Sequence, residues 1–128
     1  MDQTNGVFGL CYDDERKRIL VCDCNNQRVS VWSVDGSQFL HVINMPNKQY
    51  PMSVCVDRFL HPHYFVVGTK QSQILVFDAR NETKQMVQTI GSKGSQPGQF
   101  YSSIHGVCVR DDGALLATDD SNYRVQIF

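Results

Sequence analysis

The chain repeats one short pattern three times, and this repetition limits the possible folds more than any other feature. Each copy has an apolar run with a cysteine at its centre, then a second apolar run, then a run in which apolar and polar residues alternate. The central cysteines are Cys11, Cys55 and Cys108, which are 44 and 53 residues apart. A period of this length, built from short strands and turns, predicts an all-β chain of β-propeller type.

Each copy is expected to form one blade of antiparallel strands. We predict four strands in each of the first two blades and three in the last, which is incomplete. The blades are expected over residues 7–43, 52–90 and 105–128, within a single repeat region that covers residues 1–128. The dipeptides Asp35-Gly36 and Asp112-Gly113 predict tight hairpins between strands. No stretch keeps an apolar period of 3.6 residues for three turns, so we expect no α-helix.

Three blades are fewer than the four to eight that close a propeller ring, so the sequence predicts an open arc. One completion is a longer protein of which this chain is a part. The other is a homodimer, in which two copies join head to tail into a six-bladed ring. The end of the chain within a blade favours the longer protein.

Composition and charge argue against several classes of protein. The formal net charge is −1 at pH 7, so no overall field attracts nucleic acid or anionic lipid. No apolar run is long enough to span a membrane, and the first residues lack an apolar signal region. The cysteines in equivalent positions are expected to be small buried apolar residues rather than disulfide partners. We therefore expect a cytoplasmic protein with no membrane contact.

Patterns that carry catalysis or bind metals are weak. His61 and His63 lie two residues apart in a predicted turn, and Cys22 and Cys24 are expected on the same side of one strand. Neither pair has an obvious third ligand of the kind that zinc needs. The chain also lacks a glycine-rich phosphate loop and a nucleophile elbow. We expect no enzyme, no cofactor and no metal, with a metal-dependent lyase or hydrolase-type propeller as the alternative.

Two blades carry the same polar motif, D-x-x-N-x-R-V, where the second strand turns into the third. Its acid and its arginine are five residues apart across one turn, so they can form a charge-assisted hydrogen bond. Its asparagine can satisfy amides of the turn. We expect a structural role for these residues, which are Asp23, Asn26 and Arg28 in the first blade and Asp119, Asn122 and Arg124 in the third. In the second blade, Gly68 and Gln73 are expected in the acid and arginine positions, so the pair is missing there.

These motifs, with the linker Gly91–Phe100, closely resemble the NHL repeat over residues 7–128. The resemblance implies a β-propeller and points most often to tripartite-motif (TRIM-NHL) ubiquitin ligases and related translational repressors. In those proteins RING, B-box and coiled-coil modules precede the propeller. None of these modules is in this chain, so any ligase activity would belong to a parent protein. No Trp-Asp ending is present, which argues against WD repeats.

Charge is unevenly divided between the two sets of connections that such blades have. The connections at residues 24–28, 44–51, 68–73, 91–104 and 119–124 are expected on one face. Counted together with the adjoining Asp23, they have five bases and three acids, an excess of two bases. Bases beside planar rings suit single-stranded RNA. The expected contact residues are Lys48, Tyr50, Lys70, Lys93, Tyr101 and Tyr123. The sequence thus predicts a noncatalytic platform that recognises protein or single-stranded RNA, with a purely structural protein-interaction arc as a further alternative.

Overall fold

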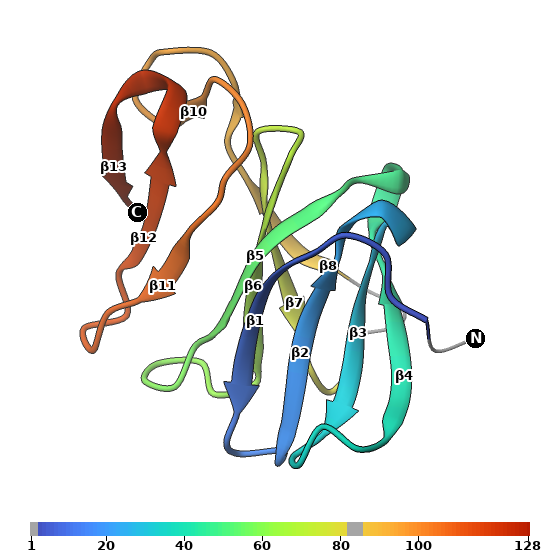
Figure 1. Cartoon of the computed structure of the whole chain (residues 1–128). Helices are drawn as coiled ribbons and strands as arrows, with labels where there is room; N and C mark the ends of the chain where they lie inside the picture. Colours follow the sequence, from blue (N-terminus) through green and yellow to red (C-terminus); the bar gives the residue numbers. More distant parts are fainter. Residues whose placement is uncertain (1–2, 82–85) are drawn as a thin grey trace.

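The protein is described here by a computed structural model of residues 3–81 and 86–128, in which three antiparallel sheets stand side by side (Figure 1). Blade 1 consists of β1 (Val7–Asp13), β2 (Arg18–Asp23), β3 (Arg28–Ser33) and β4 (Phe39–Asn44). Blade 2 consists of β5 (Pro51–Val56), β6 (Tyr64–Thr69), β7 (Ile74–Asp78) and β8 (Met86–Ile90). Blade 3 consists of β11 (Val107–Val109), β12 (Leu115–Asp119) and β13 (Arg124–Ile127). The predicted fold class, a partial β-propeller with an incomplete last blade, is confirmed.

Each blade is a meander in which strands that follow one another along the chain pair antiparallel. Both predicted Asp-Gly turns are hairpins, and their glycines have positive φ values, 74° at Gly36 and 85° at Gly113. The N–H of Gly36 donates to the carbonyl of Ser33, and that of Gly113 donates to the carbonyl of Arg110. The predicted outer strands, 38–43 and 85–90, are present as β4 and β8, with residue 85 outside the described residues.

Connections between strands emerge at two opposite ends of the blades. We define the upper face as the connections β2–β3, β4–β5, β6–β7, β8–β11 and β12–β13, which lie towards the top of Figure 1. It contains three short 3₁₀ turns, η1 (Cys24–Asn26), η2 (Pro46–Lys48) and η3 (Asp120–Asn122). It also contains a parallel pair that the sequence did not predict, β9 (Ser92–Lys93) with β10 (Gln99–Phe100). No helix among the described residues is long and apolar enough to cross a bilayer.

The core consists of two apolar layers, one in each gap between neighbouring blades. Between blades 1 and 2 the rings of Phe65 and Phe77 stack with centroids 5.0 Å apart. The other members of this layer include Leu20, Cys22, Val29, Val31, Ile43, Val54, Val67 and Leu75. Between blades 2 and 3, Phe100 and Ile104 from the β8–β11 connection are fully buried among strand residues of both sheets. The aromatic ring at the entry to blade 3 is therefore part of the core.

The three repeat cysteines occupy equivalent positions, because Cys11, Cys55 and Cys108 each pair with the second strand of their own blade. Cys11 and Cys55 pack against the two core layers. Burial, with a smaller contribution from Asp13, raises the pKa of Cys11 to about 12, and burial also raises the pKa of Cys55. Cys108 is exposed, so the prediction that it is buried was wrong. Among the described residues no further sheet covers that side of blade 3.

Candidate functional site

The turns that begin β3 and β13 each hold a hydrogen-bonded cluster of aspartate, asparagine and arginine. Arg28 Nε donates to Asp23 Oδ2 at 2.7 Å, and Arg124 Nε donates to Asp119 Oδ2 at 2.8 Å. The asparagine amide of each motif also donates to its aspartate, at 3.0 Å in blade 1 and 2.9 Å in blade 3. These are the pairs that the motif spacing predicts. We call the two groups the Asp–Asn–Arg clusters; they are Asp23, Asn26 and Arg28, and Asp119, Asn122 and Arg124.

Each cluster also holds the segment that enters its own blade, which the sequence analysis did not anticipate. In blade 1, the Asn5 N–H donates to Asp23 Oδ1 at 2.6 Å, and Arg28 Nη2 donates to the carbonyl of Gln3 at 3.0 Å. In blade 3, the Tyr101 N–H donates to Asp119, and Arg124 Nη2 donates to the carbonyls of Gln96 and Gln99, both at 2.8 Å. Each cluster therefore joins a turn to a segment between 18 and 28 residues away.

The clusters keep their aspartates charged although both residues are almost fully buried. Burial by itself raises the pKa of Asp23, but hydrogen bonds from Asn5, Asn26 and Arg28 outweigh it and hold the pKa below its ordinary value. Burial likewise raises the pKa of Asp119, but hydrogen bonds from Asn122, Arg124 and the Tyr101 amide outweigh it and lower the pKa. The negative charges of Asp23 and Asp119 are thus balanced by hydrogen-bond donors inside the protein.

Blade 2 has no acid–arginine pair at the equivalent place, and the register corrects the sequence alignment by one residue. Gly68 pairs with Ile74, as Cys22 pairs with Val29 in blade 1. The acid position is therefore occupied by Thr69, not by Gly68 as predicted, while Gln73 does occupy the arginine position. Thr69 Oγ1 donates to the carbonyl of Gln73 at 2.9 Å.

The structure pairs four of the six predicted contact residues. Lys70 Nζ lies 5.7 Å from the centre of the Tyr50 ring, and Lys93 Nζ lies 5.9 Å from the centre of the Tyr101 ring. The Lys70 N–H also donates to the Tyr50 carbonyl at 2.9 Å, which joins two connections that are far apart in the sequence. Spacing along the chain gives no sign of either pair. Lys70 and Tyr50 meet only where two connections touch, and Lys93 and Tyr101 meet only where the β8–β11 connection folds back through the β9–β10 pair.

The other two predicted contact residues, Tyr123 and Lys48, are exposed on the same face. Tyr123 follows η3 in a left-handed conformation with φ of 56°, which directs the chain into β13. Its turn touches the connection that carries Lys93 and Tyr101, because Ser121 Oγ and Ser102 Oγ are 3.0 Å apart. Lys48 ends η2, two residues before Tyr50. All six residues therefore belong to the upper face, and Lys93, Tyr101 and Tyr123 lie on adjoining segments.

The exposed charge of this face is mainly positive. Since Asp23 and Asp119 are buried beside arginines, Asp120 is the one exposed acid in these connections, all of which the structure describes. Three exposed lysines oppose it, at positions 48, 70 and 93. The charge asymmetry predicted from the sequence therefore comes from lysines beside tyrosine rings. This arrangement suits a ligand that is anionic or that packs against aromatic rings.

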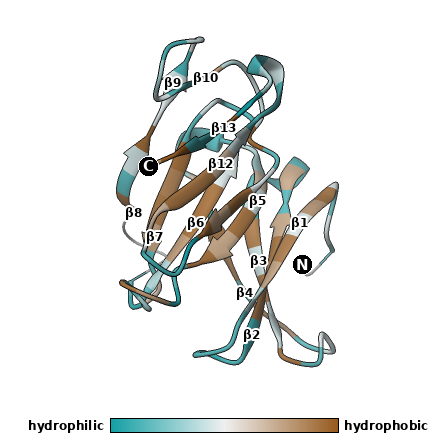
Figure 2. Ribbon diagram, turned by 90° about the vertical axis from the view of Figure 1, so that its left-hand side faces the viewer, coloured by the Kyte–Doolittle hydropathy of each residue, from teal (hydrophilic) through white to brown (hydrophobic). Residues whose placement is uncertain are grey.

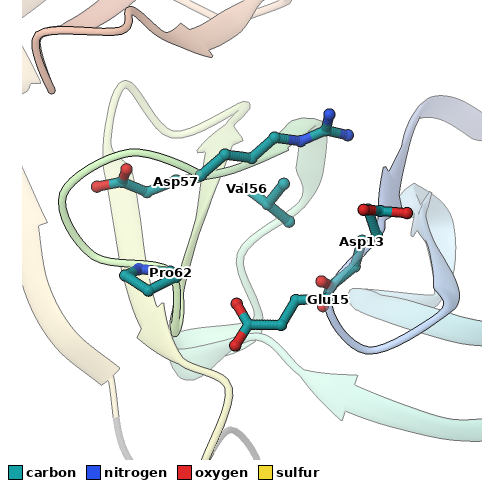
Figure 3. A pocket seen from close by; sticks show the side chains of 7 residues that line it. Asp13, Glu15, Val56, Asp57 and Pro62 are labelled. Atoms are coloured by element: carbon teal, nitrogen blue, oxygen red, sulfur yellow. The ribbon is translucent and has the colours of Figure 1, made fainter.

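The opposite, lower face has a pocket of about 310 Å³ between the β1–β2 and β5–β6 connections (Figure 3). Its lining includes Asp13, Glu15 and Asp57. The buried acids are used within their own loops, because Asp13 Oδ2 accepts from Arg18 Nε at 3.0 Å and Asp57 Oδ1 accepts from two backbone amides of its own loop. Sequence reasoning missed this pocket because its two loops are distant in the chain.

The weak metal-binding patterns have separate partners. His61 Nδ1 lies 3.1 Å from Asp57 Oδ2, whereas His63 Nδ1 lies 2.9 Å from Arg16 Nη2. Cys22 belongs to the core, but Cys24 begins η1 and its Sγ lies 3.5 Å from the sulfur of Met52. The prediction that both thiols lie on one strand was therefore wrong. Within residues 3–81 and 86–128, no three His, Cys, Asp or Glu side chains are placed together to hold a metal ion.

Comparisons with known proteins support the fold. No protein-family model matches the sequence, and no curated protein matches it. Among solved structures, the chain is similar to the crystal structure of Chaetomium thermophilum Raptor, with a TM-score of 0.75 and 19% sequence identity. The similarity covers 98% of this chain and 11% of that chain, so the protein spans about a tenth of the length of the structure it matches. At this identity the similarity supports a propeller-like fold and says nothing about a ligand.

Proposed function

We propose that the chain is a noncatalytic binding platform, part of an NHL-type β-propeller, and that its upper face recognises a protein partner. One observation carries this proposal. Exposed lysines and tyrosine rings gather on one face, while the aspartates of the motif on that face are buried and paired. A β-propeller presents its connections as a continuous rigid surface, which suits recognition rather than chemistry.

The NHL assignment rests on the Asp–Asn–Arg clusters. Both clusters have the same internal hydrogen bonds and both hold the segment that enters the blade. With this assignment, the parent is a cytoplasmic TRIM-NHL-like ubiquitin ligase or post-transcriptional regulator. Ligase activity then belongs to modules outside these residues, and this chain selects the partner.

The partner segment is expected to be acidic and to carry apolar or aromatic side chains. A lysine over an exposed ring gains only about 0.5–1 kcal/mol from the contact. A carboxylate of a partner can therefore draw Lys70 or Lys93 away from its ring. The ring of Tyr50 or Tyr101 is then free to pack against an apolar side chain, a role in which tyrosine is enriched at protein interfaces.

Fluorescence anisotropy with labelled peptides of mixed Glu and Leu tests this proposal. The double variant Lys70→Glu/Lys93→Glu is expected to weaken binding about tenfold or more, because it reverses both charges of the site. Arg80→Glu/Arg110→Glu is the matched control, since both arginines are exposed on the lower face. Equal affinity of the two double variants would contradict the proposal.

Single-stranded RNA is the second candidate ligand, favoured by the exposed ring of Tyr123 beside the segment of Lys93 and Tyr101. An oligouridine of about 12 nucleotides is then expected to bind with an affinity that falls linearly with the logarithm of salt concentration. Tyr123→Ala is expected to weaken RNA binding several-fold by removing one stacking surface. Affinity that does not change with salt would exclude RNA.

A metal-dependent lyase or hydrolase-type propeller is the alternative to a noncatalytic platform. Elemental analysis of the purified protein separates the two. A stoichiometric amount of zinc or calcium that resists dialysis would contradict the noncatalytic proposal.

A further inference from the structure

Two connections of the lower face, β1–β2 and β5–β6, are joined by the side chain of Arg16. Arg16 Nη1 donates to the carbonyl of Pro62 at 3.1 Å, and Arg16 Nη2 lies 2.9 Å from Nδ1 of His63. Figure 2 shows apolar colour along the strands of blade 1 and hydrophilic colour at the β1–β2 connection. The lower ends of blades 1 and 2 are thus joined through polar groups that are up to 47 positions apart in the chain.

The contact with Arg16 fixes the protonation state of His63. A guanidinium has donors only, so Nδ1 of His63 accepts the hydrogen bond and carries no proton. The proton of the neutral ring is therefore on Nε2. When the ring takes up a second proton, both of its nitrogens are donors and its positive charge faces the guanidinium. Protonation of His63 therefore removes the hydrogen bond and puts two like charges side by side.

The neighbouring His61 is bound in the opposite sense. Its Nδ1 lies 3.1 Å from Asp57 Oδ2. Burial raises the pKa of Asp57, but hydrogen bonds from the backbone amides of Phe59 and Leu60 and from His61 hold the pKa below its ordinary value. The carboxylate can only accept, so Nδ1 of His61 donates, and a second proton on Nε2 leaves this bond intact. Protonation of the two histidines therefore breaks only the contact between the connections.

The charged groups around His63 favour its release once it is protonated. Arg16 faces the ring from the β1–β2 connection, together with Asp13, whose Oδ2 lies 3.8 Å from Arg16 Nη1. At the end of β7, hydrogen bonds from Arg80 lower the pKa of Asp78, and the charge of His63 lowers it further. Asp78 therefore attracts the charged ring that Arg16 repels. The other ionisable groups of the same connection and of β6 beside it are Asp57, Arg58, His61 and Tyr64.

The same two connections form the walls of the lower-face pocket of about 310 Å³. Glu15 lines one wall, and Val56 and Pro62 line the other. A second contact joins the walls, because Arg58 Nη2 donates to the carbonyl of Tyr12 at 3.1 Å. This second contact has no group that titrates near neutral pH. Loss of the Arg16–His63 contact therefore loosens the walls without separating the blades.

We propose that the Arg16–His63 contact is an acid-sensitive switch of the lower face, which holds the β1–β2 and β5–β6 connections together while His63 is neutral and releases them when His63 is protonated. Histidine is the side chain that ordinarily changes charge between about pH 5 and 8, so the switch operates in this range. It lies on the face opposite the proposed ligand site and does not depend on the ligand of the upper face.

NMR of the imidazole nitrogens tests the two hydrogen bonds directly. At about pH 7.5, long-range ¹H–¹⁵N spectra are expected to show the proton of His61 on Nδ1 and that of His63 on Nε2, which are opposite tautomers in one connection. A proton on Nδ1 of His63 would overturn the proposal, because that nitrogen could not then accept from Arg16.

Hydrogen exchange measured by mass spectrometry tests the switch itself. After correction for the intrinsic exchange rate, protection of the two connections is expected to fall about tenfold from about pH 7.5 to 5.5, as when a hydrogen bond to a charged group is lost. Asparagine places its amide where Nδ1 of histidine lies, so it keeps the hydrogen bond and does not titrate. His63→Asn is expected to remove the fall. His61→Asn is the matched control and is expected to retain it.

Arg16→Ala shows the released state at any pH. At about pH 7.5 it is expected to give the low protection that the wild-type chain has at about pH 5.5, because the contact is absent in both. The β6–β7 turn of the upper face is the internal reference, and its protection is expected to stay constant. Equal wild-type protection of the two connections at both pH values would overturn the proposal. A fall that persists in His63→Asn, or one that includes the β6–β7 turn, would overturn it as well.

Discussion

In every blade, the turn between the second and third strands holds the segment that enters the blade. The side chains that do so in blade 2 differ from those in blades 1 and 3. In blades 1 and 3 a buried aspartate orients an arginine, and the arginine donates to backbone carbonyls of the entering segment. In blade 2, Gln49 Nε2 donates to Gln73 Oε1 at 3.0 Å, and the Tyr50 N–H donates to Gln71 Oε1 at 2.9 Å. The middle blade therefore uses neutral amides for the same task.

The arginines and the neutral amides differ in how many groups one side chain binds. Arg124 reaches the carbonyls of both Gln96 and Gln99 while it also binds Asp119, which requires the several donors of a guanidinium. Besides its amide contacts, the segment that enters blade 2 has two backbone hydrogen bonds. They run from the Met45 N–H to the Gln27 carbonyl and from the Lys70 N–H to the Tyr50 carbonyl. A neutral amide is sufficient there. Backbone bonds also hold the segment that enters blade 1, from the Cys24 N–H to the Gly6 carbonyl and from the Asn25 N–H to the Asn5 carbonyl, so the arginines add to backbone bonds and do not replace them.

The largest effect is expected from Arg124→Ala. It removes the donors to the entering segment and leaves the nearly buried Asp119 carboxylate without its cation, which costs about 3 kcal/mol of unfolding free energy. Urea unfolding measures the change. Arg110→Ala is the control, because its pair with Asp112 is exposed on both sides, and a change below about 0.5 kcal/mol is expected. An unchanged midpoint for Arg124→Ala would show that the cluster has no structural role.

Gly68→Ala is expected to have the next largest effect, because the middle blade is packed on both sides. The added Cβ would lie 2.8 Å from the carbonyl oxygen of Ile104 and close to the Ser53 hydroxyl, so the layer between blades 2 and 3 must shift. Overpacking of this kind costs about 2 kcal/mol. Thermal unfolding checks the loss, with Gly106→Ala on the uncovered side of blade 3 as the milder comparison.

Thr69→Val removes a hydrogen bond from the β6–β7 turn and is expected to lower the free energy of unfolding by about 1 kcal/mol. The change keeps the shape of the side chain but removes the hydroxyl that donates to the Gln73 carbonyl at 2.9 Å. Urea unfolding again gives the value. A loss of unfolding free energy as large as that of Arg124→Ala would contradict the view that the Thr69 hydroxyl stabilises the fold less than the Asp–Asn–Arg cluster of blade 3 does.

The smallest difference is expected in the acid dependence of stability. Asp23 and Asp119 have lowered pKa values in the folded chain, so their contribution is complete above the unfolded value of about 4 and is lost as pH falls through the folded pKa. Asp119→Asn should therefore flatten the decline of unfolding free energy between about pH 4 and 2, whereas Thr69→Val should leave its slope unchanged. Urea unfolding across this range measures both slopes, and equal slopes would contradict the assignment.

Local sequence patterns were sufficient for most of the fold. Short apolar runs and alternating runs identified the strands of every blade, and the Asp-Gly turns at Gly36 and Gly113 fell where the hairpins lie. The five-residue spacing of Asp23 and Arg28 indicated their pair, because both residues flank one turn. These features depend on neighbours within a few residues, so the order of residues already contains them.

Several parts of the candidate site could not be predicted in this way. The pair Lys70–Tyr50 needs two connections to meet, and the pair Lys93–Tyr101 needs the β8–β11 connection to fold back on itself. The identity of Thr69 as the residue in the acid position needed the strand register, since blade 2 has no acid–arginine pair to mark it. The parallel pair β9–β10 lies in a linker with no strand pattern of its own.

The amino-acid sequence alone determined that three similar antiparallel sheets form, in which order their strands run, and which turns carry an acid and an arginine. Those properties come from alternation and from turn chemistry, which act over a few residues. Only the tertiary structure decided which sides of the sheets are covered. Cys11 and Cys108 occupy the same position in their blades, yet one is packed and the other exposed, because burial depends on the sheet that stands opposite and not on the strand itself.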